Sequence, residues 1–103
     1  MADVEIENKE SEHRYEASVD GKPAGFAAYQ LTDLLVVFTH TEVDDAFEGQ
    51  GVGSALARGA LDDVRNRGTH KVLPLCPFIK SWIEKHDDYQ DLVYGAPRST
   101  ARD

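Results

Sequence analysis

The feature that most constrains the fold is a glycine-rich turn between an apolar segment and an amphipathic one. Glycine occupies positions 49, 51 and 53, after the apolar run at residues 34–38. Residues 52–64 then carry apolar side chains at three- and four-residue spacings, which predicts a strand, a turn and a helix. Glycine lets the backbone approach a ligand, and a helix start offers free N–H groups. The turn is therefore typical of a phosphate-binding loop.

Two standard nucleotide-binding loops do not fit this turn. A triphosphate-binding P-loop needs a Lys followed by Ser or Thr, and no such Lys is present. A dinucleotide-binding turn needs G-x-G-x-x-G, whereas the spacing here is G-x-G-x-G. What remains is a loop that holds a pyrophosphate through main-chain N–H groups. The alternative is a connector without a ligand, which would carry the entropic cost of three glycines where Ser or Asp caps a helix better.

The first half of the chain alternates between apolar and polar residues, as antiparallel strands do. Asp20 and Gly21 predict a hairpin turn. The early part of the last strand is apolar on both faces, which indicates a central position in the sheet. We expect four antiparallel strands, at residues 4–8, 15–19, 24–31 and 34–43.

The second half predicts a helix, a strand and another helix. The first helix covers residues 52–67, with Gly68 as the left-handed residue that ends it. A fifth strand at residues 71–75 then runs parallel to the fourth, because a helical crossover of this length is what parallel pairing requires. Pro77 fits the first position of the second helix. The inner face of that helix is expected to carry Phe78, Ile79, Trp82, Ile83 and His86.

The fold class that follows is α/β (α+β), with a mixed, mostly antiparallel sheet of about five strands and two main helices. A chain of 103 residues suffices for one domain with a modest core. We assign that domain to residues 1–94 and expect residues 95–103 to form a flexible tail, because they are polar and show no periodicity.

Charge and composition limit the classes of partner, compartment and metal site to be expected. A formal net charge of −8 argues against nucleic-acid binding and is compatible with a cationic partner. No apolar run approaches the roughly 20 residues of a membrane helix, and no signal peptide is evident. The single cysteine, Cys76, agrees with a reducing compartment, so we expect a cytoplasmic protein. The four histidines are scattered, so no metal site is expected.

Three segments resemble the GNAT superfamily of acetyl-CoA-dependent N-acetyltransferases. The family signature is Gln/Arg-x-x-Gly-x-Gly/Ala between the fourth strand and the next helix, and residues 48–53 (EGQGVG) match both glycine positions. Glu48 replaces the usual Gln or Arg, so only its backbone N–H remains to donate to a phosphate. Residues 38–43 (FTHTEV) and 74–78 (PLCPF) resemble the small, single-domain YJDJ-type branch. The resemblance covers roughly residues 3–94.

This resemblance implies acetyl-CoA as co-substrate and no metal. The fourth and fifth strands would splay apart, with the CoA pyrophosphate on residues 49–54 and its pantetheine along the backbone of residues 41–43. The cofactor-binding residues implied in this way are Thr41, Glu42, Val43, Glu48, Gly49, Gln50, Gly51, Val52, Gly53 and Ser54.

Cys76 and His40 are the predicted catalytic residues. Cys76 lies at the start of the second helix, where the helix dipole favours a thiolate that could accept an acyl group or transfer a proton. His40 lies four residues beyond Val36 on the fourth strand and could take the proton of an ammonium acceptor. Each residue also has an alternative interpretation. Cys76 could be a small apolar residue that fills a buried junction, and His40 an ordinary strand residue. Glu42 could be the base in place of His40, or a solvated strand residue.

The predicted function is transfer of an acetyl group to an amine, directly or through an acetyl-Cys76 intermediate. Larger GNAT enzymes place helices between their first two strands, which form one wall of the acceptor site. Here only residues 9–13 join those strands. We therefore expect an open acceptor site for an amine on a protein or peptide, in a monomer or weak dimer. The alternatives are a CoA-binding or protein-interaction module without turnover, and a structural protein without a ligand.

Overall fold

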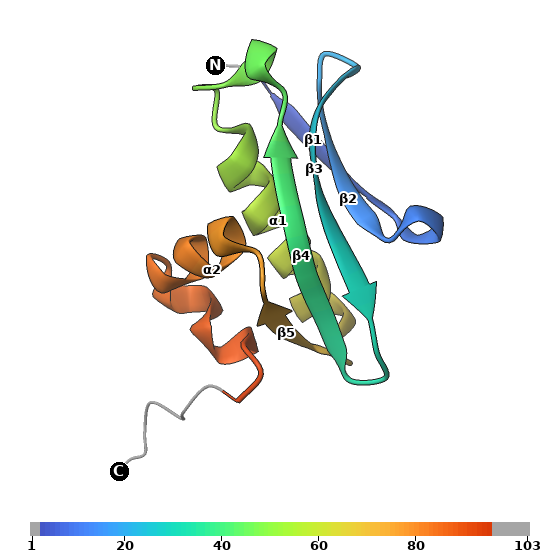
Figure 1. The fold of residues 1–103 in the computed structure, drawn as a ribbon, viewed down its shortest axis with the longest axis vertical. Coiled ribbons are helices and arrows are strands. Elements are labelled where there is room, and N and C mark those ends of the chain that lie inside the picture. The colour runs from blue at the N-terminus through green and yellow to red at the C-terminus, as the bar shows by residue number, and fades with distance from the viewer. Residues whose placement is uncertain (1–2, 96–103) are drawn as a thin grey trace.

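Five strands form one sheet in the order of the sequence (Figure 1). The structure, a computed structural model, describes residues 3–95. The first four strands pair antiparallel, and the fifth pairs parallel to the fourth. This confirms the predicted mixed sheet. The strands are β1 (Val4–Lys9), β2 (Arg14–Val19), β3 (Lys22–Leu31), β4 (Leu35–Val43) and β5 (Lys71–Pro74).

Two α-helices follow the first four strands. Helix α1 begins at Val52 and ends before Gly68, whose φ of 72° is the left-handed conformation predicted for it. The predicted tail begins at Gly95, and its residues 96–103 lie outside the described residues. The helical elements are α1 (Val52–Arg67), α2 (Pro77–Glu84) and the short 3-10 segments η1 (Glu10–Glu12), η2 (Asp45–Phe47) and η3 (Asp87–Leu92).

Helix α1 packs across β1 to β4 on one face of the sheet. Its small residues permit this close approach: a Cβ built on Gly59 would lie 3.0 Å from Cγ1 of Ile6. Leu56 and Leu61 of α1 are fully buried, as is Phe38 of β4. Burial of each such side chain contributes about 1.5–3 kcal/mol to folding.

Helix α2 lies beside α1 and buries Ile79, Trp82 and Ile83, as predicted. The prediction that Phe78 shares this inner face is wrong, because its side chain is 40% exposed. Residues 79, 82 and 83 form the buried stripe, and position 78 stands at its edge, four residues before Trp82, so the helical repeat alone does not exclude it. The Phe78 ring instead lies against Gly53, where a built Cβ would be 2.9 Å from Cζ.

A polar network fastens the C-terminal half of α1 to the sheet. The Tyr15 hydroxyl donates to Oδ2 of Asp63 over 2.7 Å, and Nε of Arg67 donates to the same oxygen over 2.9 Å. Burial, aided by this hydrogen bond, raises the pKa of Tyr15 above its ordinary value, so the hydroxyl stays a donor. The bond from Tyr15 fixes the helix against β2.

The opposite face of the sheet, which we call the open face, carries no helix among residues 3–95. Figure 1 shows α1 and α2 on the same side of the strands. The side chains that alternate onto the open face are half-buried or exposed: Arg14, Glu16, Phe26, Ala28, His40, Glu42, Val37 and Leu73. This face is therefore a surface of the molecule.

Strands β3 and β4 approach so closely at Gly25 that a side chain does not fit. A Cβ built there would lie 2.5 Å from the backbone oxygen of Glu42. We predict that Gly25→Ala lowers the free energy of unfolding by about 1–3 kcal/mol, because two backbones must separate. Gly53→Ala is the control, since only the movable ring of Phe78 obstructs it. Urea denaturation measures both variants, and equal losses would contradict this account of Gly25.

Candidate functional site

The site is built around a gap between β4 and β5. Their parallel pairing ends at Phe38 and Pro74, whereas β4 continues to Val43 (Figure 1). The Phe38 carbonyl accepts hydrogen bonds from the N–H groups of Leu75 (3.0 Å) and Cys76 (2.9 Å). The chain then leaves the sheet to enter α2. The strands thus diverge, as the resemblance to the GNAT superfamily implied.

A bulge at Thr39 decides which groups of β4 face the gap. His40 pairs with Ala28 and Phe38 with Tyr29, so Thr39 is an extra residue in β4. Further along, the Asp44 N–H donates to the Ala24 carbonyl of β3. Because the backbone groups of an antiparallel strand alternate in direction, those of Thr41 and Val43 point away from β3 and toward the gap. Those of Glu42 pair with β3.

The glycine turn lies where the chain enters α1. Gly49 and Gly51 have φ values of 82° and 81°, a left-handed conformation that favours glycine. Gly51 is the N-cap of α1, and no side chain caps the helix. The first intrahelical bond runs from the Ala55 N–H to the Gly51 carbonyl over 3.0 Å. The N–H groups of residues 52–54 therefore point out of the helix start without intrahelical partners.

Two other N–H groups of the turn are already bonded. The Glu48 N–H donates to the Asp45 carbonyl and the Gln50 N–H to the Phe47 carbonyl, each over 3.3 Å. The expectation that the Glu48 backbone N–H is free for a ligand is therefore not met. The donors that the turn offers belong to the glycines and to the first turn of α1.

Helix α2 stabilises the start of α1 from the side. The indole N–H of Trp82 donates to Oγ of Ser54 over 2.9 Å. Trp82 also stacks on His86, with ring centroids 3.7 Å apart. The Ser54 hydroxyl thus has a partner within the protein, and its backbone N–H remains directed outward.

Cys76 lies on the helix side of the gap. Its side chain is only 3% exposed, and Sγ donates to Oγ1 of Thr41 over 3.3 Å. Cys76 is also the N-cap of α2, and its carbonyl accepts the Lys80 N–H over 3.0 Å. The structure therefore brings together two of the predicted site residues, Cys76 and Thr41. The Cys76 thiol is buried and hydrogen-bonded to Thr41.

His40 lies on the other side of the sheet. Its Nε2 is 2.8 Å from Oε2 of Glu42, and its ring centroid is 5.9 Å from that of Phe26. Strict alternation would place His40 on the face of Val36, but the bulge at Thr39 turns it onto the open face. His40 and Cys76 therefore face opposite sides of β4, and the structure does not bring them together.

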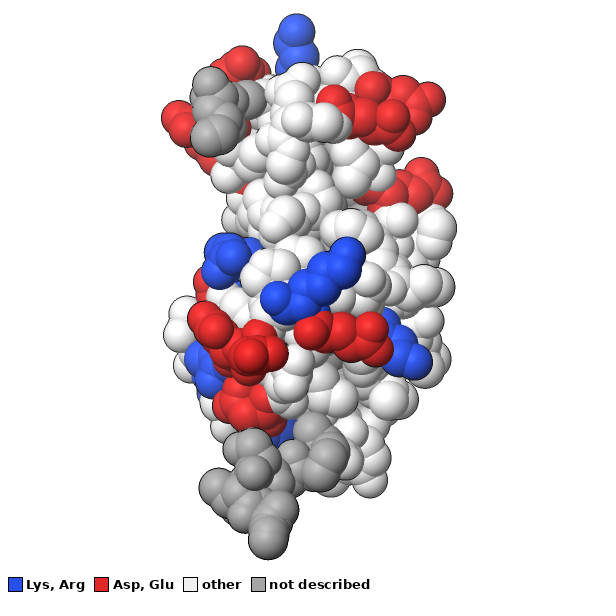
Figure 2. All heavy atoms as spheres, turned by 90° about the vertical axis from the view of Figure 1, so that its left-hand side faces the viewer, with Lys and Arg blue, Asp and Glu red and all other residues white. Residues whose placement is uncertain are grey.

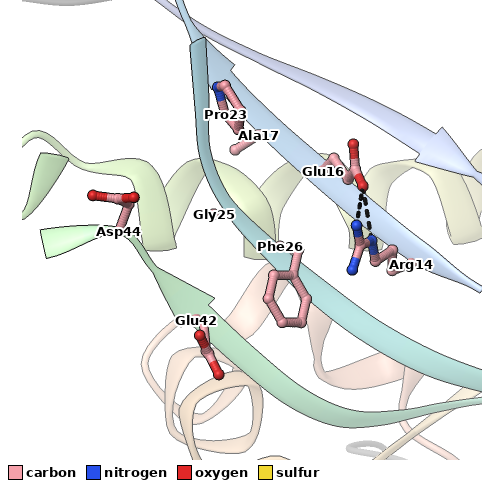
Figure 3. A pocket seen from close by; sticks show the side chains of 8 residues that line it. All are labelled: Arg14, Glu16, Ala17, Pro23, Gly25, Phe26, Glu42 and Asp44. Carbon is pink, nitrogen blue, oxygen red and sulfur yellow. Dashed lines mark hydrogen bonds and ion pairs between the residues drawn. The ribbon is translucent and has the colours of Figure 1, made fainter. Parts of the chain in front are cut away.

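A pocket of about 330 Å³ lies on the open face beside His40 and Glu42. Figure 3 shows its lining side chains on β2, β3 and the end of β4, with Arg14 and Glu16 bonded to each other. Sequence reasoning missed this pocket, because its residues lie far apart in the chain and only the strand register unites them. The lining residues are Arg14, Glu16, Ala17, Pro23, Gly25, Phe26, Glu42 and Asp44.

Charged side chains are mixed over the face that carries the helices. Figure 2 shows basic and acidic side chains interleaved in its lower half, and acidic side chains flanking an uncharged area in its upper half. A phosphate bound on this face would therefore depend on main-chain donors. In the part of the chain that the structure describes, no group of three or more His, Cys, Asp or Glu residues could hold a metal ion. Within that part, no helix has the length and apolar character of a membrane span either.

Comparison with known proteins identifies the family. A model of the family described as GCN5-related N-acetyl-transferase matches residues 14–92. The chain belongs to the GCN5-related N-acetyltransferase family. This confirms the resemblance drawn from the glycine turn and the expected enzyme class, an acetyltransferase. A search of curated protein sequences found no match.

Solved structures of this family agree in fold. A GCN5-like N-acetyltransferase candidate from Staphylococcus aureus is 27% identical with a TM-score of 0.68, and the similarity covers 100% of both chains. The ribosomal-protein-S18-alanine N-acetyltransferase of Escherichia coli is 27% identical with a TM-score of 0.53, over 57% of this chain and 38% of that one. A ribosomal-protein-alanine N-acetyltransferase from Brucella melitensis biovar Abortus 2308, 21% identical, shares the fold with a TM-score of 0.53 over 87% of this chain and 67% of its own.

Proposed function

We propose that this acetyltransferase uses acetyl-CoA and transfers the acetyl group to an amine on a peptide or protein. One observation carries the proposal: the uncapped glycine turn of α1 and the unpaired edge of β4 belong to the same gap. The first supplies N–H donors for a pyrophosphate, and the second supplies strand backbone for an amide-containing chain such as pantetheine. Both features fit CoA.

The residues that would hold acetyl-CoA follow from the backbone directions. The glycines at 49, 51 and 53, with the N–H groups of Val52 and Ser54, would bind the pyrophosphate. Thr41 and Val43 would bind the pantetheine through their backbone. Acetyl-CoA supplies a thioester, whose C–S bond breaks as the C–N bond to the amine forms; the amine loses a proton and the CoA sulfur gains one.

Cys76 and His40 would act from the two sides of β4. Cys76, on the helix side, is our candidate for the group that accepts the acetyl group or transfers a proton, with Thr41 as its hydrogen-bond partner. His40, on the open face, is our candidate base for an ammonium acceptor that arrives from that side, with Glu42 orienting its ring. Because the two residues are separated by the strand, we assign them separate steps.

The proposal also covers the domain, the oligomeric state, the compartment and the acceptor. Residues 1–94 would act as one domain, as a monomer or weak dimer in the cytoplasm. The ribosomal-protein acetyltransferases among the similar structures act on a protein amine. A protein acceptor is therefore consistent with the fold.

The direct test of the donor site is a calorimetric titration of acetyl-CoA into the wild type and the Gly53→Glu variant. We expect saturable one-site binding to the wild type and at least tenfold weaker binding to the variant. The added carboxylate would repel the pyrophosphate at the helix start, where one lost charge-assisted contact costs about 1.5–3 kcal/mol.

Asn66→Glu is the matched control, because it adds the same charge at the far end of α1. It should bind acetyl-CoA as the wild type does. Circular dichroism confirms that both variants are folded. Absence of binding to folded wild-type protein, or equal weakening by the two substitutions, would contradict the proposed donor site.

The two catalytic candidates are tested by Cys76→Ala and His40→Ala. We expect each to reduce transfer to a peptide amine by about 10²-fold or more, the usual contribution of a positioned acid or base. Acetyl-CoA binding should be retained in both. Mass spectrometry of wild-type protein mixed with acetyl-CoA alone shows whether an acetyl group accumulates on Cys76. A folded variant with full transfer activity would remove that residue from the mechanism, and a wild type that binds acetyl-CoA without transfer would support the binding-module alternative.

A further inference from the structure

The pocket on the open face has an acidic lining. Three carboxylates, those of Glu16, Glu42 and Asp44, line it against a single guanidinium, that of Arg14. Arg14 is already paired with Glu16 over 2.7 Å and with Glu12 over 3.3 Å. The pair neutralises both Arg14 and Glu16, so Glu42 and Asp44 supply the negative charge that attracts a cation.

The pocket also has an apolar side. Phe26 is half-buried, and its ring lies between the guanidinium of Arg14, 5.0 Å from the centroid, and the ring of His40. Gly25 beside it leaves room for a ligand because it has no side chain, and a Cβ there would collide with the backbone of β4. An aromatic ring next to carboxylates suits a side chain with an apolar stem and a charged head.

The position of the pocket connects it to the proposed transfer site. Glu42 lines the pocket and bonds His40, our candidate base, over 2.8 Å. Both residues stand on β4, whose other edge borders the gap toward β5. An amine bound in the pocket would thus lie beside the base and next to the strand that borders the donor site.

The openness of the face favours a peptide over a free amine. Sites for small molecules enclose most of the ligand, and about 330 Å³ is near the lower end of their range. Only η1 and His13 connect β1 to β2, and no helix of residues 3–95 covers the open face. A peptide could place one side chain in the pocket and gain further contacts along the uncovered strands.

We propose that this pocket is the acceptor subsite and that it binds a lysine side chain of an extended peptide. Glu42 and Asp44 attract the ammonium group, and Phe26 contacts the methylene stem. The inference rests on the proposed function, because it gives the same reaction its acceptor.

The test is a titration of isotope-labelled protein with a short peptide that carries one lysine, followed by amide NMR. We expect saturable shifts at Gly25, Phe26, Glu42 and Asp44. The same peptide with norleucine in place of lysine keeps the stem and lacks the charge, so it should bind several-fold more weakly. Equal binding of the two peptides, or shifts confined to other elements, would overturn the proposal.

Asp44→Asn removes one charge and keeps an oxygen to accept the Ala46 N–H that Asp44 now binds over 2.9 Å. We expect it to weaken lysine-peptide binding about two- to fivefold, the range of an exposed charge pair. Asp33→Asn is the control, since it removes the same charge from the turn between β3 and β4, at the other end of β4. Identical dissociation constants for Asp44→Asn and the wild type would overturn the assignment of Asp44.

Calorimetry with acetyl-CoA on the same samples separates the two proposals. Acetyl-CoA binding without lysine-peptide binding would overturn the acceptor subsite and leave the donor site standing. Lysine-peptide binding in the pocket without acetyl-CoA binding would overturn the proposed function and leave a lysine-binding surface.

Discussion

The structure depends on the point at which β5 stops pairing with β4. The N–H groups of Lys71 and Leu75 donate to the carbonyls of Leu34 and Phe38, so every second residue of β5 faces β4 and the Pro74 nitrogen faces away from it. The Cys76 N–H donates to the Phe38 carbonyl as well, and the ladder ends on that oxygen. Pro77 then fixes the first position of α2. A strand and a helix are thus joined within three residues, and the chain must leave the sheet. Within residues 3–95, the outer half of β4 keeps one edge without a strand partner, which is what a backbone-binding ligand requires.

Buried contacts around the junction stabilise the divergence of β4 and β5. Phe38 and Ile79, on either side of the junction, are fully buried, and the Trp82 indole bonds Ser54 across the two helices. These contacts hold α1 and α2 in place without β5 extending further. Successive side chains of a strand point to opposite faces, and the bulge at Thr39 decides which face each one takes: Thr41 points toward Cys76 and His40 toward the open face. One strand consequently separates a donor side from an acceptor side, which explains how a chain of 103 residues can present both.

The order of elements could be predicted because each has a local signature. Alternating apolar residues mark the strands, Asp20 and Gly21 mark a turn, and Gly68 ends α1 in the left-handed conformation. The bulge at Thr39 has no such signature, since it results from how two strands pair, and it decides the face of His40. The open-face pocket was invisible for the same reason: Arg14, Phe26 and Asp44 meet only through the register of three strands. The exposed position of Phe78 depends on how α2 lies against α1, which helical periodicity alone does not determine.

The central claim is that Thr41 and Val43 direct free backbone groups into the gap between β4 and β5. Amide hydrogen exchange measures this residue by residue. In the protein without ligand, we predict fast exchange at Thr41 and Val43 and slow exchange at Val36 and Phe38, which pair with β5. Addition of acetyl-CoA should slow exchange at Thr41, at Val43 and in residues 51–54. Equal protection of all four β4 amides in the protein without ligand would contradict the account, because β4 would then be paired along its whole length and no gap would exist.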